Sequence, residues 1–203
     1  MTEITREQLI RDAFFELMKN VGTSIPGQVS GFDPVTQLAQ VQIGIATLLD
    51  TGVTVDAPPI VEVPVYQPGG QYCVECEIAV GDEGLVVFSQ RTLDNWRETG
   101  GVVSPLPLRF HDVSDALFFP GFRSKPNALP AHQNNGIRLR NADGAQYVWL
   151  KNDGSVSISA STVDIVTTDP DGLTHNGVNV GSTHTHTGVT PGSGTSGPVT
   201  PTP

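Results

Sequence analysis

Residues 135–160 constrain the fold of this chain more than any other stretch. The segment "NGIRLRNADGAQYVWLKNDGSVSISA" alternates apolar and polar residues, and its "NADG" and "NDG" are strong signals for tight turns. It predicts an antiparallel meander in which each strand presents one apolar stripe. The stripes are expected at Ile137 and Leu139, then Tyr147 and Trp149, then Val156, Ile158 and Ala160. The alternation shifts before Val163 and Ile165, which predicts a bulge or corner.

Nothing else in this part of the chain is left to cover those stripes, and a small meander with one bare apolar face is not stable alone. The apolar fraction of the whole chain is 37%, below the roughly 45–50% that is usual for globular proteins. Both observations favour burial completed between chains. A trimer in which three stripes meet on an axis is the economical solution. A sandwich of two chains is the competing one, and the alternation does not decide between them.

Residues 25–129 predict a small β-barrel. "IPGQVSGFD" and "QLAQVQIGI" flank a "DPVT" turn and predict a hairpin. Further strands are expected in "PPIVEVPVYQ", "YCVECEIAV" and "EGLVVFSQ". Five short strands without a second helix suit a Greek-key barrel such as an OB-fold. "HDVSDALFFPGFRSKPNAL" (111–129) is expected to be a structured loop that leaves the barrel.

A helix is predicted over residues 5–21, where Thr5 and Gln8 form a capping box and Gly22 marks the end. Its apolar stripe is too pronounced for a free surface helix. We therefore expect it to pack on its own domain or on a neighbouring subunit. The stripe consists of Leu9, Ile10, Ala13, Phe14, Leu17, Met18 and Val21.

Charge and hydropathy argue against several classes of function. The formal net charge is −10, from 21 acidic and 11 basic residues, and Lys and Arg form no cluster. A nucleic-acid-binding surface is therefore not expected, although OB-folds are often nucleic-acid readers. No apolar run approaches the roughly 18–20 residues of a membrane span. The N-terminal "MTEITREQLIRDAFFELMKN" carries charges within its apolar part, so we do not expect a signal peptide.

Two sets of side chains that could bind a metal or catalyse hydrolysis are better explained by structural roles. Cys73 and Cys76 form a single C-x-x-C, half of a structural zinc site, and are interpreted as ordinary thiols in a strand. His111, Asp112 and Asp115 lie close together, but no nucleophile elbow or framing pair of carboxylates accompanies them. They are interpreted as a capping histidine and turn carboxylates. No enzymatic activity is expected.

The C-terminal "GSTHTHTGVTPGSGTSGPVTPTP" places His184 and His186 one residue apart in a Gly-, Thr- and Pro-rich segment. One interpretation is chance within a flexible tail. The other is a metal site completed by several copies of the chain. In an extended segment, residues i and i+2 face the same way, so both imidazoles of one chain can point toward an axis.

Three parts of the sequence resemble the central baseplate spike, or membrane-piercing protein, of contractile-tailed bacteriophages and R-type pyocins. "VGDEGLVVFSQRTLDNW" and "HDVSDALFFPGF" are similar to the family's OB-fold domain, and "NADGAQYVWLKNDGSVSIS" to the start of its intertwined trimeric β-helix. "STHTHTGVTPGSGTSGP" resembles its His-x-His tip. The resemblance implies four parts: a helix and arm (1–24), an OB-fold domain (25–129), a trimeric β-helix stem (130–180) and a metal-bound tip (181–203).

The resemblance also implies a function. A homotrimer would cap the tail tube, bind the baseplate hub in the virion, and puncture the host outer membrane when the sheath contracts, without nucleic acid or catalysis. One iron ion would be held by His184 and His186 of all three chains, as six imidazole nitrogens. Structural zinc is almost always four-coordinate, whereas imidazole also suits iron. The alternative is a baseplate adaptor or receptor-binding β-protein with no metal tip.

Overall fold

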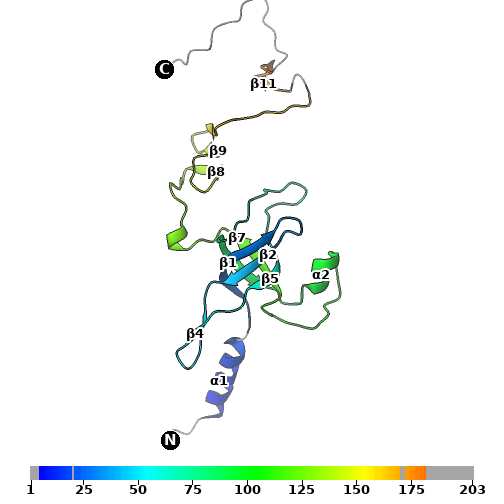
Figure 1. Cartoon of the computed structure of the whole chain (residues 1–203), viewed down its shortest axis with the longest axis vertical. Helices are drawn as coiled ribbons and strands as arrows, with labels where there is room; N and C mark the ends of the chain where they lie inside the picture. The colour runs from blue at the N-terminus through cyan, green and yellow to red at the C-terminus, as the bar shows by residue number, and fades with distance from the viewer. Residues whose placement is uncertain (1–4, 20, 170–171, 182–203) are drawn as a thin grey trace, which may run out of the picture. The chain divides into compact units, whose positions relative to one another are not determined.

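The computed structural model describes residues 5–19, 21–169 and 172–181. It divides into two compact units, Met1–Ala128 and Leu129–Pro203. Apart from one long helix, the structure is mostly β, as predicted (Figure 1). The four-part division given above is finer than these two units and remains a prediction.

The first unit contains a curled five-stranded sheet. Its strands are β1 (Ser24–Asp33), β2 (Leu38–Ile43), β5 (Ile60–Pro64), β6 (Glu83–Phe88) and β7 (Ala116–Pro120). They lie in the order β5-β2-β1-β6-β7, and every neighbouring pair is antiparallel. The two edges approach each other, because Val65 forms a parallel bridge with Phe118 and the Tyr66 amide donates to the Phe118 carbonyl at 2.8 Å. The arrangement is the partly open barrel of an OB-like fold, which confirms the predicted class.

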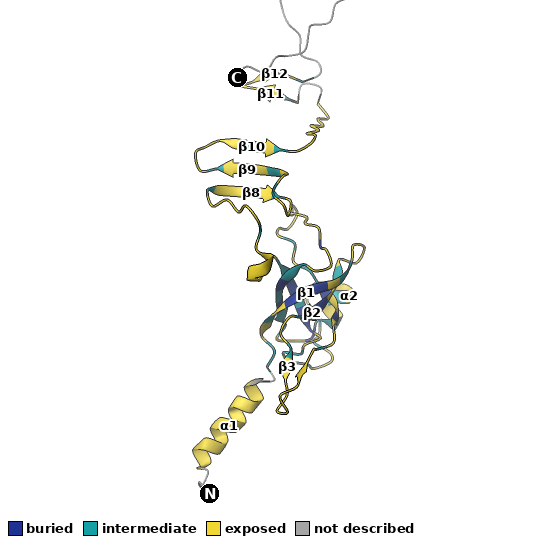
Figure 2. Ribbon diagram, turned by 60° about the vertical axis from the view of Figure 1, so that its left-hand side comes forward, coloured by how far each residue is buried: buried dark blue, intermediate teal, exposed yellow. Residues whose placement is uncertain are grey.

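The barrel encloses its own apolar core, seen as the dark blue strands in Figure 2. Along β6, buried and half-buried residues alternate, so Gly84, Val86 and Phe88 point inward. Gly84 lies so close to the core that an added Cβ would be 2.4 Å from the Phe118 ring. The buried apolar residues are Val29, Ala39, Val41, Ile60, Val63, Ile78, Val86, Phe88, Ala116 and Phe118.

One strand prediction and one loop prediction were wrong. "YCVECEIAV" forms no strand apart from a bridge between Gly69 and Cys73, and within it only Ile78 is buried. The fifth strand is instead β7, in the stretch predicted to be a loop. Its side chains explain the difference, because Ala116 and Phe118 enter the core and close the barrel.

The connections between the strands hold further short elements. β3 (Thr47–Leu48) and β4 (Thr54–Val55) form a hairpin after β2. A six-residue helix, α2 (Asp94–Thr99), lies between β6 and β7, so the expectation of a barrel without a second helix was wrong. A 3-10 turn, η1 (Lys125–Asn127), follows β7.

Helix α1 (Arg6–Lys19) confirms the predicted N-terminal helix. The capping box forms, because the Gln8 amide donates to Thr5 Oγ1 at 3.2 Å and the Thr5 amide donates to Gln8 Oε1 at 2.9 Å. Every described side chain from Arg6 to Met18 is exposed (Figure 2), so packing on its own domain was the wrong alternative. Packing on a neighbouring subunit remains a prediction. Among the described residues, no helix combines the length and apolar character needed to cross a membrane.

The second unit is built around the predicted meander. Strands β8 (Gly136–Arg140), β9 (Tyr147–Lys151) and β10 (Val156–Ser159) form an antiparallel sheet in the order β10-β9-β8. Both tight turns are present where predicted. A two-residue ladder of β11 (Thr174–His175) and β12 (Val178–Asn179) follows.

Polar side chains and glycines shape the two turns of the meander. Asn141 Oδ1 accepts from the amides of Gly144 and Gln146 at 3.0 and 3.1 Å. Asp153 Oδ1 accepts from the Ser155 amide at 2.8 Å. Gly144 and Gly154 have φ angles of 80° and 84°, in the region that favours glycine. These turns fix which residues pair across the sheet.

Candidate functional site

One face of the β8–β10 sheet consists of exposed aliphatic side chains. The strand register pairs Ile137 with Leu150 and Leu139 with Val148. It also pairs Val156 with Leu150 and Ile158 with Val148, so all six residues share a face. They are between 40% and 70% exposed. We call these six residues the aliphatic face. Contiguous exposed apolar surface of this kind marks an interaction site.

The opposite face of the same sheet is cationic and aromatic. Arg138 pairs with Trp149, and Arg140 pairs with Tyr147. The guanidinium carbon of Arg138 lies 3.8 Å from the Tyr147 ring centroid and 5.4 Å from that of Trp149. Lys151 Nζ lies 4.8 Å from the Trp149 centroid. These distances are typical of cation–π contacts.

The predicted stripe of the middle strand was therefore wrong. Tyr147 and Trp149 pack against cations on the second face, whereas Val148 and Leu150 join the aliphatic face. Periodicity could not choose between the two, because "YVWL" is apolar in both phases. The missed signal was the pair of tight turns, since these set the register and place Val148 opposite Leu139.

The cationic face is held largely by its own chain. Arg138 Nη2 donates to the Gly144 carbonyl at 2.6 Å. Arg140 Nη1 and Nη2 donate to the carbonyls of Pro130 and Ala142 at 2.8 and 2.7 Å. The aliphatic face has no comparable partner within the described residues, where all six of its side chains remain exposed. Within the described residues, the cationic face is thus held by hydrogen bonds to its own chain, whereas the aliphatic face has no apolar surface packed against it.

The predicted metal ligands, His184 and His186, lie outside the described residues. Within the described residues, no group of three or more His, Cys, Asp or Glu side chains is placed to hold a metal ion. Cys73 and Cys76 are both exposed. As a donor set, two imidazoles from each chain of a trimer would supply the six nitrogens of the predicted iron site.

Asp115, one of the candidate hydrolytic residues, is a buried anchor. Its side chain is fully buried and accepts from the Leu93 amide at 2.9 Å and from Arg109 Nε at 3.0 Å. Arg109 Nη2 also reaches Asp94 Oδ1 at 3.0 Å. Burial alone would raise the pKa of Asp115, but the hydrogen bonds from Arg109 and the Leu93 amide outweigh it and hold that pKa below its ordinary value. The network ties α2 to β7.

The neighbouring candidates also have structural partners. His111 Nδ1 lies 3.1 Å from the Gly22 carbonyl oxygen, in the segment between α1 and β1. Asp112 Oδ1 accepts from the Ser114 amide at 2.9 Å and from its hydroxyl at 2.6 Å. The capping histidine and turn carboxylate predicted from sequence fit these contacts.

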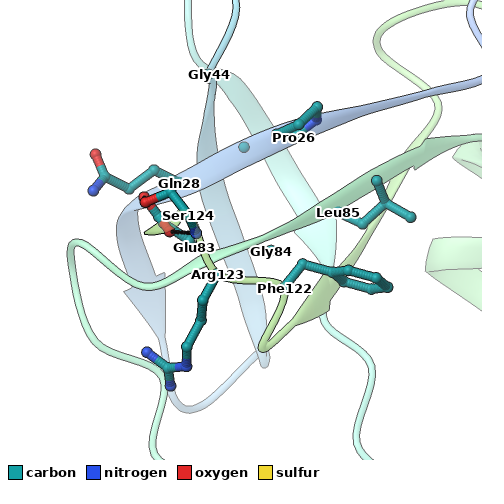
Figure 3. A pocket seen from close by; sticks show the side chains of 10 residues that line it. Pro26, Gln28, Gly44, Glu83, Gly84, Leu85, Phe122, Arg123 and Ser124 are labelled. Carbon is teal, nitrogen blue, oxygen red and sulfur yellow. Dashed lines mark hydrogen bonds between the residues drawn. The ribbon is translucent and has the colours of Figure 1, made fainter. Parts of the chain in front are cut away.

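A cavity of about 440 Å³ lies on the barrel between β1, β6 and residues 122–124 (Figure 3). The Glu83 carboxylate accepts from the Ser124 amide and hydroxyl at 2.6 and 2.8 Å, and from Asn127 Nδ2 at 2.7 Å. These Ser124 donors hold the pKa of Glu83 below its ordinary value. Glu83, the one carboxylate among the described residues that line the cavity, thus fastens the segment after β7 to β6.

The first unit belongs to the class of OB-like barrels. Residues 25–121, which run from β1 through β7, match the family model described as the phage protein Gp138 N-terminal domain. No curated protein matches the chain. The match supports a phage structural protein and is consistent with a component of the virion.

Proposed function

We propose that this chain is the non-enzymatic membrane-piercing spike at the end of a contractile phage tail. Three copies form a needle that caps the tail tube at the baseplate hub and punctures the host outer membrane when the sheath contracts. The aliphatic face of the β8–β10 sheet is the observation that carries the proposal. The match of the barrel to a phage family model supports the part of the proposal that makes this chain a phage protein.

Association through the aliphatic face supplies the burial that one chain lacks. Burying one aliphatic side chain fully contributes about 1.5–3 kcal/mol, and the six residues of the face are already partly covered. A gain on the order of 1 kcal/mol for each residue, repeated in three chains, would offset a large part of the free-energy cost of association. Three such sheets around an axis leave toward solvent their cationic faces, whose arginines already donate to backbone carbonyls of the same chain.

His184 and His186 of the three chains hold one iron ion in the proposed spike. The bound ion supplies a structural cross-link, with no part in catalysis. The imidazoles join three chain ends in a Gly-, Thr- and Pro-rich segment that offers little apolar surface for packing. The tip is thereby kept together under axial load.

Light scattering and elemental analysis on the same size-exclusion fraction test the proposal. We expect the mass of three 21.5 kDa chains and one iron per trimer. A metal-free monomer or dimer would contradict the spike. That result would favour an adaptor or receptor-binding β-protein instead.

A further inference from the structure

Residues 122–127, which follow β7, lie on the barrel and are exposed along their whole length. We call these residues the strap. Phe122, the largest apolar residue of the strap, is 60% exposed, whereas Phe118 of β7 is completely buried in the core. The chain therefore passes directly from a strand that is held by apolar packing to a segment that is not.

Glu83 fastens the strap to β6 through both of its carboxylate oxygens (Figure 3). Oε2 accepts from the Ser124 amide at 2.6 Å, and Oε1 accepts from the Ser124 hydroxyl at 2.8 Å and from Asn127 Nδ2 at 2.7 Å. We call these three hydrogen bonds the latch. Within the described residues, the strap forms no other hydrogen bond to the barrel. The preceding Gly121 amide donates to the Glu83 carbonyl at 3.0 Å.

The latch lies outside the core of the barrel. Along β6 the residues Gly84 and Val86 point inward, so the side chain of Glu83 lies on the outer surface. Opening the latch therefore removes no apolar contact from the buried residues. Its cost is limited to the hydrogen bonds of one half-buried carboxylate, which are stronger than those between neutral groups because the acceptor is ionised.

We propose that the strap is a releasable segment: when the latch opens, residues 122–127 leave β6 while the barrel stays folded. The last residue held on the barrel is then Gly121 instead of Asn127. The connection to the second unit gains the length of residues 122–127, which is roughly 20 Å when fully extended.

The release has a mechanical role in the proposed spike, and this step rests on the proposed function. Load on the needle acts along the connection between the two units. It reaches the latch before it reaches β7, because the strap follows β7 in the chain. The hydrogen bonds of Glu83 then open before Phe118 is pulled from the core, and the barrel stays intact when the needle meets resistance.

Limited trypsin digestion of the full chain tests the latch. Trypsin cuts after Arg123, whose exposed side chain extends away from the latch (Figure 3). The bond that is cut carries the Ser124 amide held by Glu83. Lys125 gives no competing cut in the strap, because Pro126 follows it. We expect Glu83→Ala to speed cleavage after Arg123 about ten-fold, because proteolysis follows the population of the open form.

Three further measurements make the test specific. Asn127→Ala removes one donor from the strap and should speed the same cleavage about three-fold. Combined with Glu83→Ala it should add nothing, because its partner is already gone. Glu77→Gln, an exposed change that removes the same charge, should leave the wild-type rate. Cleavage after Arg11 in the exposed helix α1 is the internal standard.

The outcomes decide between release and a different origin of the cleavage. Equal cleavage after Arg123 in wild type and Glu83→Ala, or none in the variant, would overturn the latch. Cleavage after Arg109, which bonds to Asp115 in the barrel, would rise in step if the barrel opened with the strap, and this would overturn the release. Asn127→Ala, which lies outside the core, gives the same decision should Glu83→Ala fail to fold.

The latch and the spike fail separately. The latch lies within one chain, and light scattering on the same samples tests the trimer. A monomer that shows the expected acceleration would overturn the spike and leave the latch standing. A trimer without the acceleration would overturn the latch alone.

Discussion

At the scale of single residues, the buried carboxylate of Asp115 has the largest predicted effect on the barrel. It accepts hydrogen bonds from a backbone amide and from Arg109, and it immediately precedes β7 of the five-stranded sheet. The loop that it anchors contains α2, which has no buried residues. The position of this loop therefore depends on a few charge-assisted hydrogen bonds.

We predict that Asp115→Ala lowers the free energy of unfolding by about 3 kcal/mol, because Arg109 loses its buried partner. The folded-state pKa of Asp115 lies below its ordinary value of 3.8, so its contribution is present above about pH 4 and is lost as the pH falls toward the folded-state value. Denaturant unfolding at several pH values should show the difference between wild type and variant shrinking below about pH 4. Glu98→Gln, an exposed change on α2, is the control and should have little effect at any pH.

The two histidines of the C-terminal segment carry a second prediction at this scale. The double variant His184→Ala, His186→Ala should lose its metal, because both proposed ligands of each chain are removed, while the proposed trimer persists through the aliphatic face. Elemental analysis and light scattering measure the two properties separately. His132→Ala, which changes a histidine distant from this segment in sequence, is the control. Unchanged metal content in the double variant would refute the assignment.

At the scale of elements, the two faces of the β8–β10 sheet should respond differently to charge. Val148→Asp with Leu150→Asp places carboxylates on the aliphatic face and should convert the proposed trimer to monomer, because each charge would have to be buried without a partner. Ser157→Asp lies on the cationic face, opposite Trp149, and should leave the mass unchanged. Dissociation by Ser157→Asp, or a trimer with both carboxylates in place, would contradict the proposed interface.

Elements with one clear pattern were predictable from sequence. The capping box of α1, the hairpin around "DPVT" and the two Asn/Asp-Gly turns all depend on interactions within a few residues. For that reason, local chemistry was sufficient to predict them. The predicted OB-like class also followed from the number and spacing of short strands.

Elements whose residues support two patterns were not predictable. "YCVECEIAV" alternates as well as any strand, but only Ile78 finds space in the core. The "ALFFP" stretch of β7 lacks simple alternation, yet Phe118 fills the barrel and is completely buried. Which segment occupies the last position in the sheet is decided by the shape of the core, and this depends on residues far away in the sequence. For "YVWL" in β9, the sequence pattern likewise could not show which residues lie on the aliphatic face, because the stretch is apolar in both phases.

At the scale of the whole molecule, the two units differ in how much of their apolar surface they bury within one chain. The first has its own closed core, whereas the main sheet of the second exposes its aliphatic face. We predict that truncation after Leu129 leaves a folded barrel whose trimerisation is much weaker than that of the full chain. Circular dichroism tests the fold, and sedimentation over a range of concentrations tests association. A fragment that remained a tight trimer would show that the stem is not the main association element.

Because the barrel buries its core within one chain and the aliphatic face does not, we expect the barrel to fold before the chains associate. A core built within one chain forms at a rate that does not depend on protein concentration, whereas a sheet that needs three chains must wait for their encounter. In the proposed trimer the barrels are therefore complete before the aliphatic faces meet. Refolding at increasing dilution would slow only the second event, and the unassembled chain would expose its aliphatic face for longer. Aggregation during production should accordingly begin at that sheet rather than at the barrel.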